Sequence, residues 1–399
     1  MRLARWLLAA PMIWCGFPVC AQYDVSLPTE EKGKPFTISA QVRQEYDDNV
    51  YTQEVNRQES WKSQVIPTFI FNYPMDRTLI SARYTFGLTY FWDRPGDDVN
   101  FSHEFVGRIA HTFTERFDVD VRDRLVYNYE PDLRSPTTTR FVDGNYLIND
   151  FSTFARFQWL PRFGNTLEYD NRVIDYDDGE ISDREDRMEH TFNLENRWQV
   201  LPTTVGVLAY RFNLVEYDGL PKSSHSHFLM GGVDHKISDV WLVSARGGAE
   251  MRNFDQGDDS LAPYFSLNTS YSYAPNSSAS LFYSHSLSLT DVGTYTVQMN
   301  DTIGLNVYHA FTPDFGLRVG SAFSWGEYDA ENTIDDGAWG EVVAQDFGEF
   351  SMYLDAALSY TFNEHFSAEL GYIFSHLDSE LPGRDYDRNR YYIGLRGTY

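Results

Sequence analysis

Two histidine-containing stretches carry the residue types that could perform chemistry. His225 and His227 lie two residues apart in S-S-H-S-H-F, so on a strand both side chains would share a face and could bind a metal ion. A third ligand is not identifiable in the sequence. In Y-S-H-S the base His285 stands between Ser284 and Ser286, but neighbours on a strand point to opposite faces, so His285 could activate neither serine. We expect no catalytic residue, no metal site and no cofactor.

The tetrad Y-D-D-N, which consists of Tyr46, Asp47, Asp48 and Asn49, is a second candidate, and it follows the alternating stretch F-T-I-S-A-Q-V-R-Q. Asp and Asn end strands readily because their side chains bond to nearby backbone. Their oxygens could also bind calcium, although the spaced Asp pattern of a calcium loop is missing. We predict that the tetrad ends the first strand. In a transmembrane barrel this end would lie at the outer mouth, and the tyrosine would lie in the girdle of aromatic residues at the membrane interface. Similar stretches occur at 169–171, 176–178 and 386–389.

The N-terminus has the features of a secretory signal. A basic start, M-R-L-A-R, precedes an apolar run that ends in V-C-A, residues that a signal peptidase accepts. We predict a signal peptide over residues 1–21 and a mature chain that begins at Gln22. Lipidation of Cys20 is the alternative, which the bulky valine before it disfavours. Cys15 and Cys20 would leave with the signal, which excludes disulfides and thiolate metal sites.

The composition is typical of a bacterial outer-membrane β-barrel. The chain has 58 acidic and 32 basic residues, which argues against nucleic acid as a partner because phosphate binding needs a basic surface. Aromatic residues make up 16% of the chain, which is high for a soluble acidic protein. No apolar run after the signal approaches the ~20 residues of a membrane-spanning helix. An exported, acidic, aromatic and weakly hydrophobic chain is expected to cross the membrane with strands.

Alternation of side chains predicts these strands. In T-L-I-S-A-R-Y-T-F-G-L-T-Y-F-W the apolar residues share one parity and the polar residues the other, and 366–375 repeats the pattern. Such a strand turns one face to lipid and the other to a wet lumen. We therefore predict an all-β fold, a transmembrane antiparallel β-barrel.

Short connections separate the strands: Y-P-M-D-R, F-T-E-R-F, L-P-R-F-G, L-P-T-T, I-S-D-V, A-P-N-S-S, F-T-P-D-F and F-N-E-H-F. Longer polar segments, such as 177–187 and 329–339, lie between them. Short periplasmic turns and longer acidic extracellular loops predict a barrel of about 18 strands (16–18) over residues 36–399. Residues 22–35 would form a periplasmic lead-in.

The last strand, Y-Y-I-G-L-R-G-T-Y, places Tyr391, Ile393, Leu395 and Tyr399 on one face. A terminal aromatic residue on such a strand resembles the signal read by the outer-membrane barrel-assembly machinery. We expect this machinery, membrane lipid and lipopolysaccharide to be partners. The sequence does not indicate an oligomeric state.

A family resemblance rests on the strand into Y-D-D-N-V-Y and on the closing strand, which follows Y-D-R-N-R and ends G-L-R-G-T-Y. These stretches, in an exported chain of this size, resemble the putative β-barrel porin 2 family over essentially the mature chain. The resemblance implies an outer-membrane barrel, often associated with exopolysaccharide and exosortase loci, and therefore polysaccharide as a further partner. It implies no catalytic residues, so we predict that the protein is not an enzyme.

Parity also predicts the pore lining. The lumen receives Arg83, Arg122, Arg124, Arg156, Arg197, Arg211, Arg246, Arg318 and Arg396, together with Asp118, Asp120, Glu195, Glu250 and Glu369. The arginines either neutralise these carboxylates or form a charged wall that sets selectivity. Because ions respond most to the charges nearest their path, we predict a weakly selective or mildly anion-preferring channel. Residues 131–145 are the candidate for a long loop folded into the lumen.

Two functions are compatible with this sequence. The first is a porin-like channel for small hydrophilic solutes or for polysaccharide passage. The second is a non-conducting structural or docking barrel whose acidic loops bind divalent cations and surface glycan. We expect one loop to bind divalent cations weakly through its crowded carboxylates, Glu327, Asp329, Glu331, Asp335 and Asp336.

Overall fold

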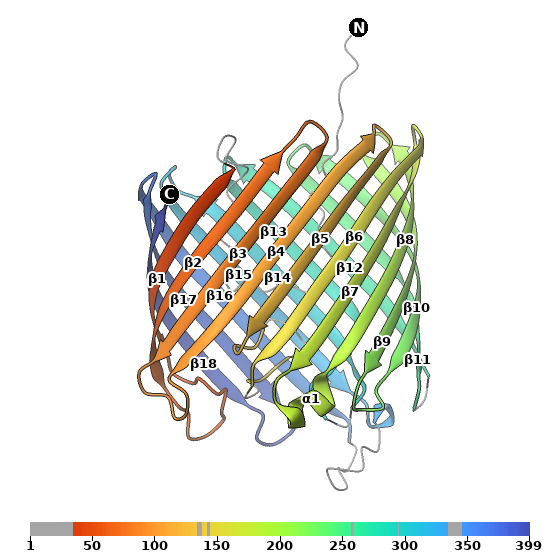
Figure 1. The fold of residues 1–399 in the computed structure, drawn as a ribbon. Coiled ribbons are helices and arrows are strands. Elements are labelled where there is room, and N and C mark those ends of the chain that lie inside the picture. The colour runs from red at the N-terminus through yellow and green to blue at the C-terminus, as the bar shows by residue number, and fades with distance from the viewer. Residues whose placement is uncertain (1–34, 134–137, 142–143, 257–258, 294, 334–344) are drawn as a thin grey trace.

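A computed structural model of the chain describes residues 35–133, 138–141, 144–256, 259–293, 295–333 and 345–399. Eighteen antiparallel strands close into one barrel (Figure 1). The strands are β1 (Phe36–Asp47), β2 (Ser60–Pro74), β3 (Thr78–Phe91), β4 (Val99–Thr114), β5 (Phe117–Asn128), β6 (Tyr146–Leu160), β7 (Phe163–Tyr176), β8 (Arg187–Leu201), β9 (Thr204–Tyr217), β10 (Ser224–Ser238), β11 (Trp241–Phe254), β12 (Ser260–Ala274), β13 (Ser277–Leu289), β14 (Val297–Ala310), β15 (Phe315–Tyr328), β16 (Phe347–Asn363), β17 (Phe366–Ser379) and β18 (Tyr386–Thr398). The predicted fold class and the predicted strand number are confirmed.

Two short helices lie in loops at one end, α1 (Gly179–Glu185) and the 3₁₀ turn η1 (Ala330–Asn332). Within the described ranges, neither helix has the length and apolar character needed to cross a membrane.

Neighbours in sequence are neighbours in the sheet, and β1 pairs with β18 to close it. The register of this seam runs from Ser39 opposite Thr398 to Asp47 opposite Arg390. Closure satisfies the backbone hydrogen bonds that an open sheet edge would leave unpaired in lipid. The barrel therefore depends on a pairing between residues more than 340 positions apart in the chain.

The eight short connections occur where the sequence predicts them, for example between Pro74 and Thr78 and between Asn363 and Phe366. They gather at the end of the barrel that also holds the C-terminus, whereas α1 and the longer loops lie at the opposite end (Figure 1). The first end is periplasmic and the second extracellular, as outer-membrane barrels are arranged.

The two faces of each strand differ as the alternation predicts. On β1, Gln41, Arg43, Glu45 and Asp47 point into the barrel and are at least 95% buried, whereas Val42 between them is 60% exposed on the outside. Exposed apolar side chains continue around the outer surface, where lipid covers them. The apolar side chains that a soluble protein would bury therefore face the membrane.

The signal peptide (1–21) and nearly all of the lead-in (22–35) lie outside the described residues and stay predictions. Pro35 is described, and its carbonyl accepts a hydrogen bond from the Asn72 amide at 2.9 Å. The barrel thus begins where the sequence places its first strand.

The last strand shows why the chain end matters. Tyr391, Ile393 and Leu395 are each more than half exposed on the lipid side of β18. Tyr399 and Ile38 exchange backbone hydrogen bonds of 2.8 and 3.1 Å, which form the periplasmic end of the seam.

Deleting Thr398 and Tyr399 should therefore reduce the amount of folded protein in outer membranes, because the deletion removes a terminal pair of seam bonds and the terminal aromatic residue. Heat-modifiable migration in electrophoresis measures the folded fraction. The variant Tyr399→Phe keeps the backbone and a terminal ring and should fold as the wild type does. Undiminished folding of the deletion would contradict the role assigned to the last strand.

Candidate functional site in the barrel lumen

A cavity of about 1930 Å³ occupies the lumen beside strands β2 to β12. At the periplasmic end it reaches residues of the short turns, among them Arg116, Arg162 and Asp239. Toward the outside it stops at Asn128 and Tyr129, and Tyr129 alone contributes to its lining among the described residues of the long loops. We call this cavity the vestibule, because its lining includes residues of the periplasmic rim.

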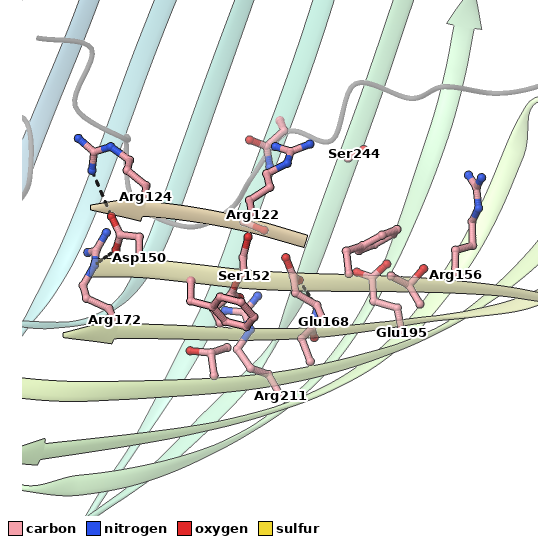
Figure 2. A pocket seen from close by; sticks show the side chains of 18 of the residues that line it. Arg122, Arg124, Asp150, Ser152, Arg156, Glu168, Arg172, Glu195, Arg211 and Ser244 are labelled. Atoms are coloured by element: carbon pink, nitrogen blue, oxygen red, sulfur yellow. Dashed lines mark hydrogen bonds and ion pairs between the residues drawn. The ribbon is translucent and has the colours of Figure 1, made fainter. Parts of the chain in front are cut away.

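Every residue predicted to line the pore lies at an inward position of its strand. The vestibule is lined by Arg83, Arg122, Arg124, Arg156, Arg197, Arg211, Arg246 and Glu195, several of which project into it in Figure 2. Inward positions on other parts of the wall hold Arg318, Arg396, Glu250 and Glu369, and inward positions of β5 hold Asp118 and Asp120. Of these, Glu250 is fully buried against Arg252 and Ser226, so it does not face open space.

Ion pairs connect these charges across neighbouring strands. Arg124 contacts Glu104 at 2.9 Å and Asp150 at 3.1 Å, and Arg172 contacts the same Asp150 at 2.6 Å (Figure 2). Farther round the wall, Arg246 joins Glu195 and Asp234 in the same way. A guanidinium held between two carboxylates is largely neutralised for a passing ion. We call this chain of pairs the ladder.

The parity count of lumen charges was incomplete. It missed the basic residues Arg43, Lys62, Arg108, Arg172, Arg187, Lys236, Arg252, Arg388 and Arg390, and the acidic residues Glu45, Asp47, Glu104, Asp150, Glu168, Asp170, Glu189, Asp234, Glu349 and Asp355. Strands of 12 to 17 residues extend beyond the 9–11 that cross hydrocarbon, so inward charges continue past the stretch read from the sequence. With these residues the described strands carry 18 inward basic and 15 inward acidic side chains, so a basic excess of three remains and the expected anion preference stays a prediction.

The tetrad lies at the outer end of the seam. Strand β1 ends at Asp47, as predicted, and Tyr46 faces outward, where its ring lies 5.2 Å from that of Trp61. Asp48 accepts hydrogen bonds from the backbone and side-chain nitrogens of Asn389, at 2.6 and 2.7 Å. Asn49 donates to the Asp387 carbonyl at 2.9 Å. The similar stretch at 386–389 is therefore the tetrad's partner on β18.

Asp47 points inward and joins a buried ionic network. Its carboxylate contacts Arg388 and Lys62, each at 2.6 Å, and Asp47 and Arg388 are completely buried. Arg388 also contacts Glu130 at 2.6 Å, and Arg390 contacts Glu130 at 3.2 Å. The Lys62 ammonium and the Arg388 guanidinium thus contact the Asp47 oxygens that a calcium ion would need.

Glu130 belongs to the segment between β5 and β6, part of which was the candidate for an inward-folded loop. We call the described residues of this segment, 129–133, 138–141 and 144–145, the inner loop. Burial alone would raise the pKa of Glu130, but Arg388, Lys62 and Arg390 outweigh burial and hold that pKa below its usual value. Leu133 packs against the inward faces of β15 to β18, next to Leu377 and Tyr386. The described part of the inner loop therefore crosses the lumen from β5 to the seam.

Thr139 fixes the far side of the inner loop. Its amide and hydroxyl donate to Asp291 at 2.7 and 2.8 Å, and its carbonyl accepts from the Tyr386 hydroxyl at 2.7 Å. Arg384, between β17 and β18, donates to the Thr139 hydroxyl and contacts Asp291 and Glu349. These contacts join the inner loop to residues of several other loops at the extracellular end. The sequence carried no local signal for the contacts of Thr139, because Asp291, Arg384 and Tyr386 are each more than 150 positions away.

The histidine stretches lie on the lipid side. His227 shares a 2.8 Å hydrogen bond with the Tyr210 hydroxyl, and the rings of His225 and His227 are 5.8 Å apart. His285 contacts Asp301, on the face opposite Ser284. Within the described ranges no three His, Cys, Asp or Glu side chains gather to hold a metal ion. Of the loop carboxylates expected to bind cations, Asp335 and Asp336 lie outside those ranges.

An eighteen-stranded closed barrel with a lipid-facing apolar surface and a charged lumen defines a porin-like protein of the bacterial outer membrane. Residues 35–399 match the family described as Putative beta-barrel porin 2, and the chain belongs to this family.

Solved structures give weaker likenesses. OccK2 (OpdF) of Pseudomonas aeruginosa, in complex with glucuronate, is 10% identical with a TM-score of 0.48, over 91% of this chain and 98% of that one. OccAB4 of Acinetobacter baumannii is 11% identical with a TM-score of 0.45, over 92% and 99%. These values carry nothing about solute or mechanism. No curated protein matches the chain.

Replacing Arg388 by Met should lower the free energy of unfolding by about 3–5 kcal/mol, because Asp47 and Glu130 would keep buried charge without their main partner. Denaturant unfolding of the detergent-folded barrel measures this change. Arg57→Met is the matched control, since the pair of Arg57 with Asp387 is exposed and should contribute less than about 1 kcal/mol. Equal losses in the two variants would contradict the assignment of the buried network as a stabilising element.

Proposed function

We propose that the protein is a channel for small hydrophilic solutes that enter or leave through the vestibule. The observation that carries the proposal is the vestibule itself, a cavity of about 1930 Å³ whose lining includes many charged and amide side chains and which extends from the periplasmic rim along most of the wall. A barrel that served only as a scaffold would not need such a cavity. Charged and amide side chains along the path favour hydrated solutes over apolar ones.

The inner loop sets the condition for conduction. Glu130 and Thr139 hold the inner loop across the lumen, and we expect a solute to cross only when these contacts are released. The ground state of the channel is therefore closed to the outside. Release of the inner loop would connect the vestibule with the extracellular mouth.

Polysaccharide passage and a non-conducting docking barrel are the two alternatives. A polymer strand would need the inner loop displaced along its whole length, whereas a docking barrel would keep that loop in place. The support for a small-solute channel is that the vestibule is preformed while the inner loop is in place.

Single-channel recording in planar bilayers tests the proposal. The wild type should open rarely, and Arg384→Ala should raise the open probability on the order of tenfold, because one hydrogen bond to a charged group contributes about 1.5–3 kcal/mol. Arg57→Ala, which removes an exposed arginine of another loop, should behave as the wild type. Absence of conductance in every variant would favour the docking barrel, and current blocked by polysaccharide but not by small solutes would favour polymer passage.

The inner loop should also keep the channel closed in mild acid. The pKa of Glu130 is depressed, so its stabilising contribution is present above the ordinary Glu pKa of about 4.3 and is lost only as the pH falls through the lower folded value. Open probability should therefore stay constant from neutral pH down to about 4.5 and rise below that. Glu130→Gln should open more often across the whole range. A wild-type channel that opens steadily between neutral pH and pH 5 would contradict this role of Glu130.

A further inference from the structure

Two guanidinium groups share a single carboxylate on the wall of the lumen. Arg108 on β4 and Arg122 on β5 lie directly opposite each other in the register of the two strands. Asp120 contacts Arg108 at 2.6 Å and Arg122 at 3.1 Å. Like charges directly opposite each other destabilise a sheet, and one shared carboxylate offsets only part of their repulsion. We call Arg108 and Arg122 the arginine pair.

Each guanidinium uses one edge for the shared carboxylate. Arg108 donates to Asp120 through Nε and Nη2, at 3.1 and 2.6 Å, and Arg122 does so through the same two nitrogens, at 3.1 and 3.3 Å. Nη1 of neither arginine donates to a residue in the described part of the chain, and each side chain is 37% exposed. The second edge of each guanidinium is therefore open to a solute.

Short uncharged side chains surround the arginine pair. In the same row of the sheet, Ser81 flanks it on β3 and Ser152 flanks it on β6. The adjacent inward residues of β4 are Val106 and Ala110. None of these four side chains carries a charge, so they leave both the charge and the open edges of the arginine pair unmatched.

The ladder shows how a fully compensated arginine is held. Arg124, the next inward residue of β5, lies between two carboxylates, Glu104 at 2.9 Å and Asp150 at 3.1 Å. Asp150 is diagonal to Arg122 in the sheet, but it is engaged by Arg124 and by Arg172. The arginine pair thus has one carboxylate for two guanidinium groups and keeps one positive charge.

The arginine pair lies on the path through the vestibule. Arg122 is one of its lining residues, midway along β5, and Figure 2 shows its side chain pointing into the cavity from the strand next to that of Ser152. A solute that moves between the periplasmic turns and the inner loop passes this position.

We propose that the arginine pair binds the carboxylate group of small organic acids. A carboxylate is planar, accepts a fork of hydrogen bonds from a guanidinium edge, and carries the single negative charge that neutralises the arginine pair. The solute would supply the second carboxylate that Arg124 receives from the protein itself. This inference rests on the proposed channel function. It goes beyond the predicted anion preference, because it names one site and one functional group.

Equilibrium binding to the detergent-folded barrel tests the proposal without any need for current. Acetate and chloride carry the same charge, but only acetate can accept a fork of two hydrogen bonds. Nuclear magnetic resonance of the acetate methyl group, with chloride as competitor, gives both affinities. Acetate should bind about tenfold more tightly than chloride, because hydrogen bonds between charged groups are the strong ones.

Two pairs of variants locate the site. Arg122→Gln should remove most of the preference for acetate, whereas Arg162→Gln, which deletes an exposed guanidinium at the rim of the same vestibule, should leave it within about twofold. Ser152→Asp places a carboxylate directly opposite Arg122, where it would take the place of the solute's carboxylate. This variant should lose acetate binding although it keeps both arginines, and the uncharged Ser152→Asn should retain it.

Equal binding of acetate and chloride would show charge attraction without a built site and would overturn the proposal, as would undiminished acetate binding by Ser152→Asp. Tighter binding of phosphate than of acetate, lost in Arg122→Gln, would overturn it in favour of a phosphate site. Heat-modifiable migration of each variant checks that the barrel is folded. A channel that conducts but shows no preference for acetate leaves the proposed function intact, and a barrel that binds acetate but never conducts removes the channel and keeps the site.

Discussion

Pairing of the first strand with the last is the constraint on which this molecule depends. In lipid the backbone groups of β1 and β18 have no water to bond with, so the sheet must close. The outer end of that seam is also where the buried contact of Asp47 with Arg388 lies, flanked by Asp48 and Asn389. Because Glu130 binds the same Arg388, barrel closure and the position of the inner loop share one set of charges. Loss of one of these charges should therefore affect both.

The alternation of side chains was sufficient to predict the strands, the eight turns and the inward positions of nine arginines, because period two and turn chemistry are local properties. The partner of the tetrad could not be predicted in the same way. Asp47 and Arg388 are both visible as charged residues in similar stretches, yet only the closure of the barrel brings them together. The same holds for Thr139 and Asp291, whose contact depends on how a loop lies inside the lumen.

Charge compensation explains why the electrostatic character of the lumen cannot be read from a simple count of its charged residues. Each guanidinium of the ladder, such as Arg124 between Glu104 and Asp150, is held by carboxylates from adjacent strands. Parity found nine of the inward arginines and missed others, together with many of the carboxylates that pair with them.

We propose a vestibule that is accessible from the periplasm and closed to the outside by the inner loop. Its most direct test is the reactivity of a cysteine placed at Ser244, an inward position of the vestibule (Figure 2). In vesicles with uniformly oriented protein, a membrane-impermeant maleimide should label Ser244→Cys rapidly from the periplasmic side and slowly from the extracellular side. Removal of the Arg384 side chain should make the two rates similar. Rapid labelling of the otherwise unaltered barrel from the extracellular side would contradict the account.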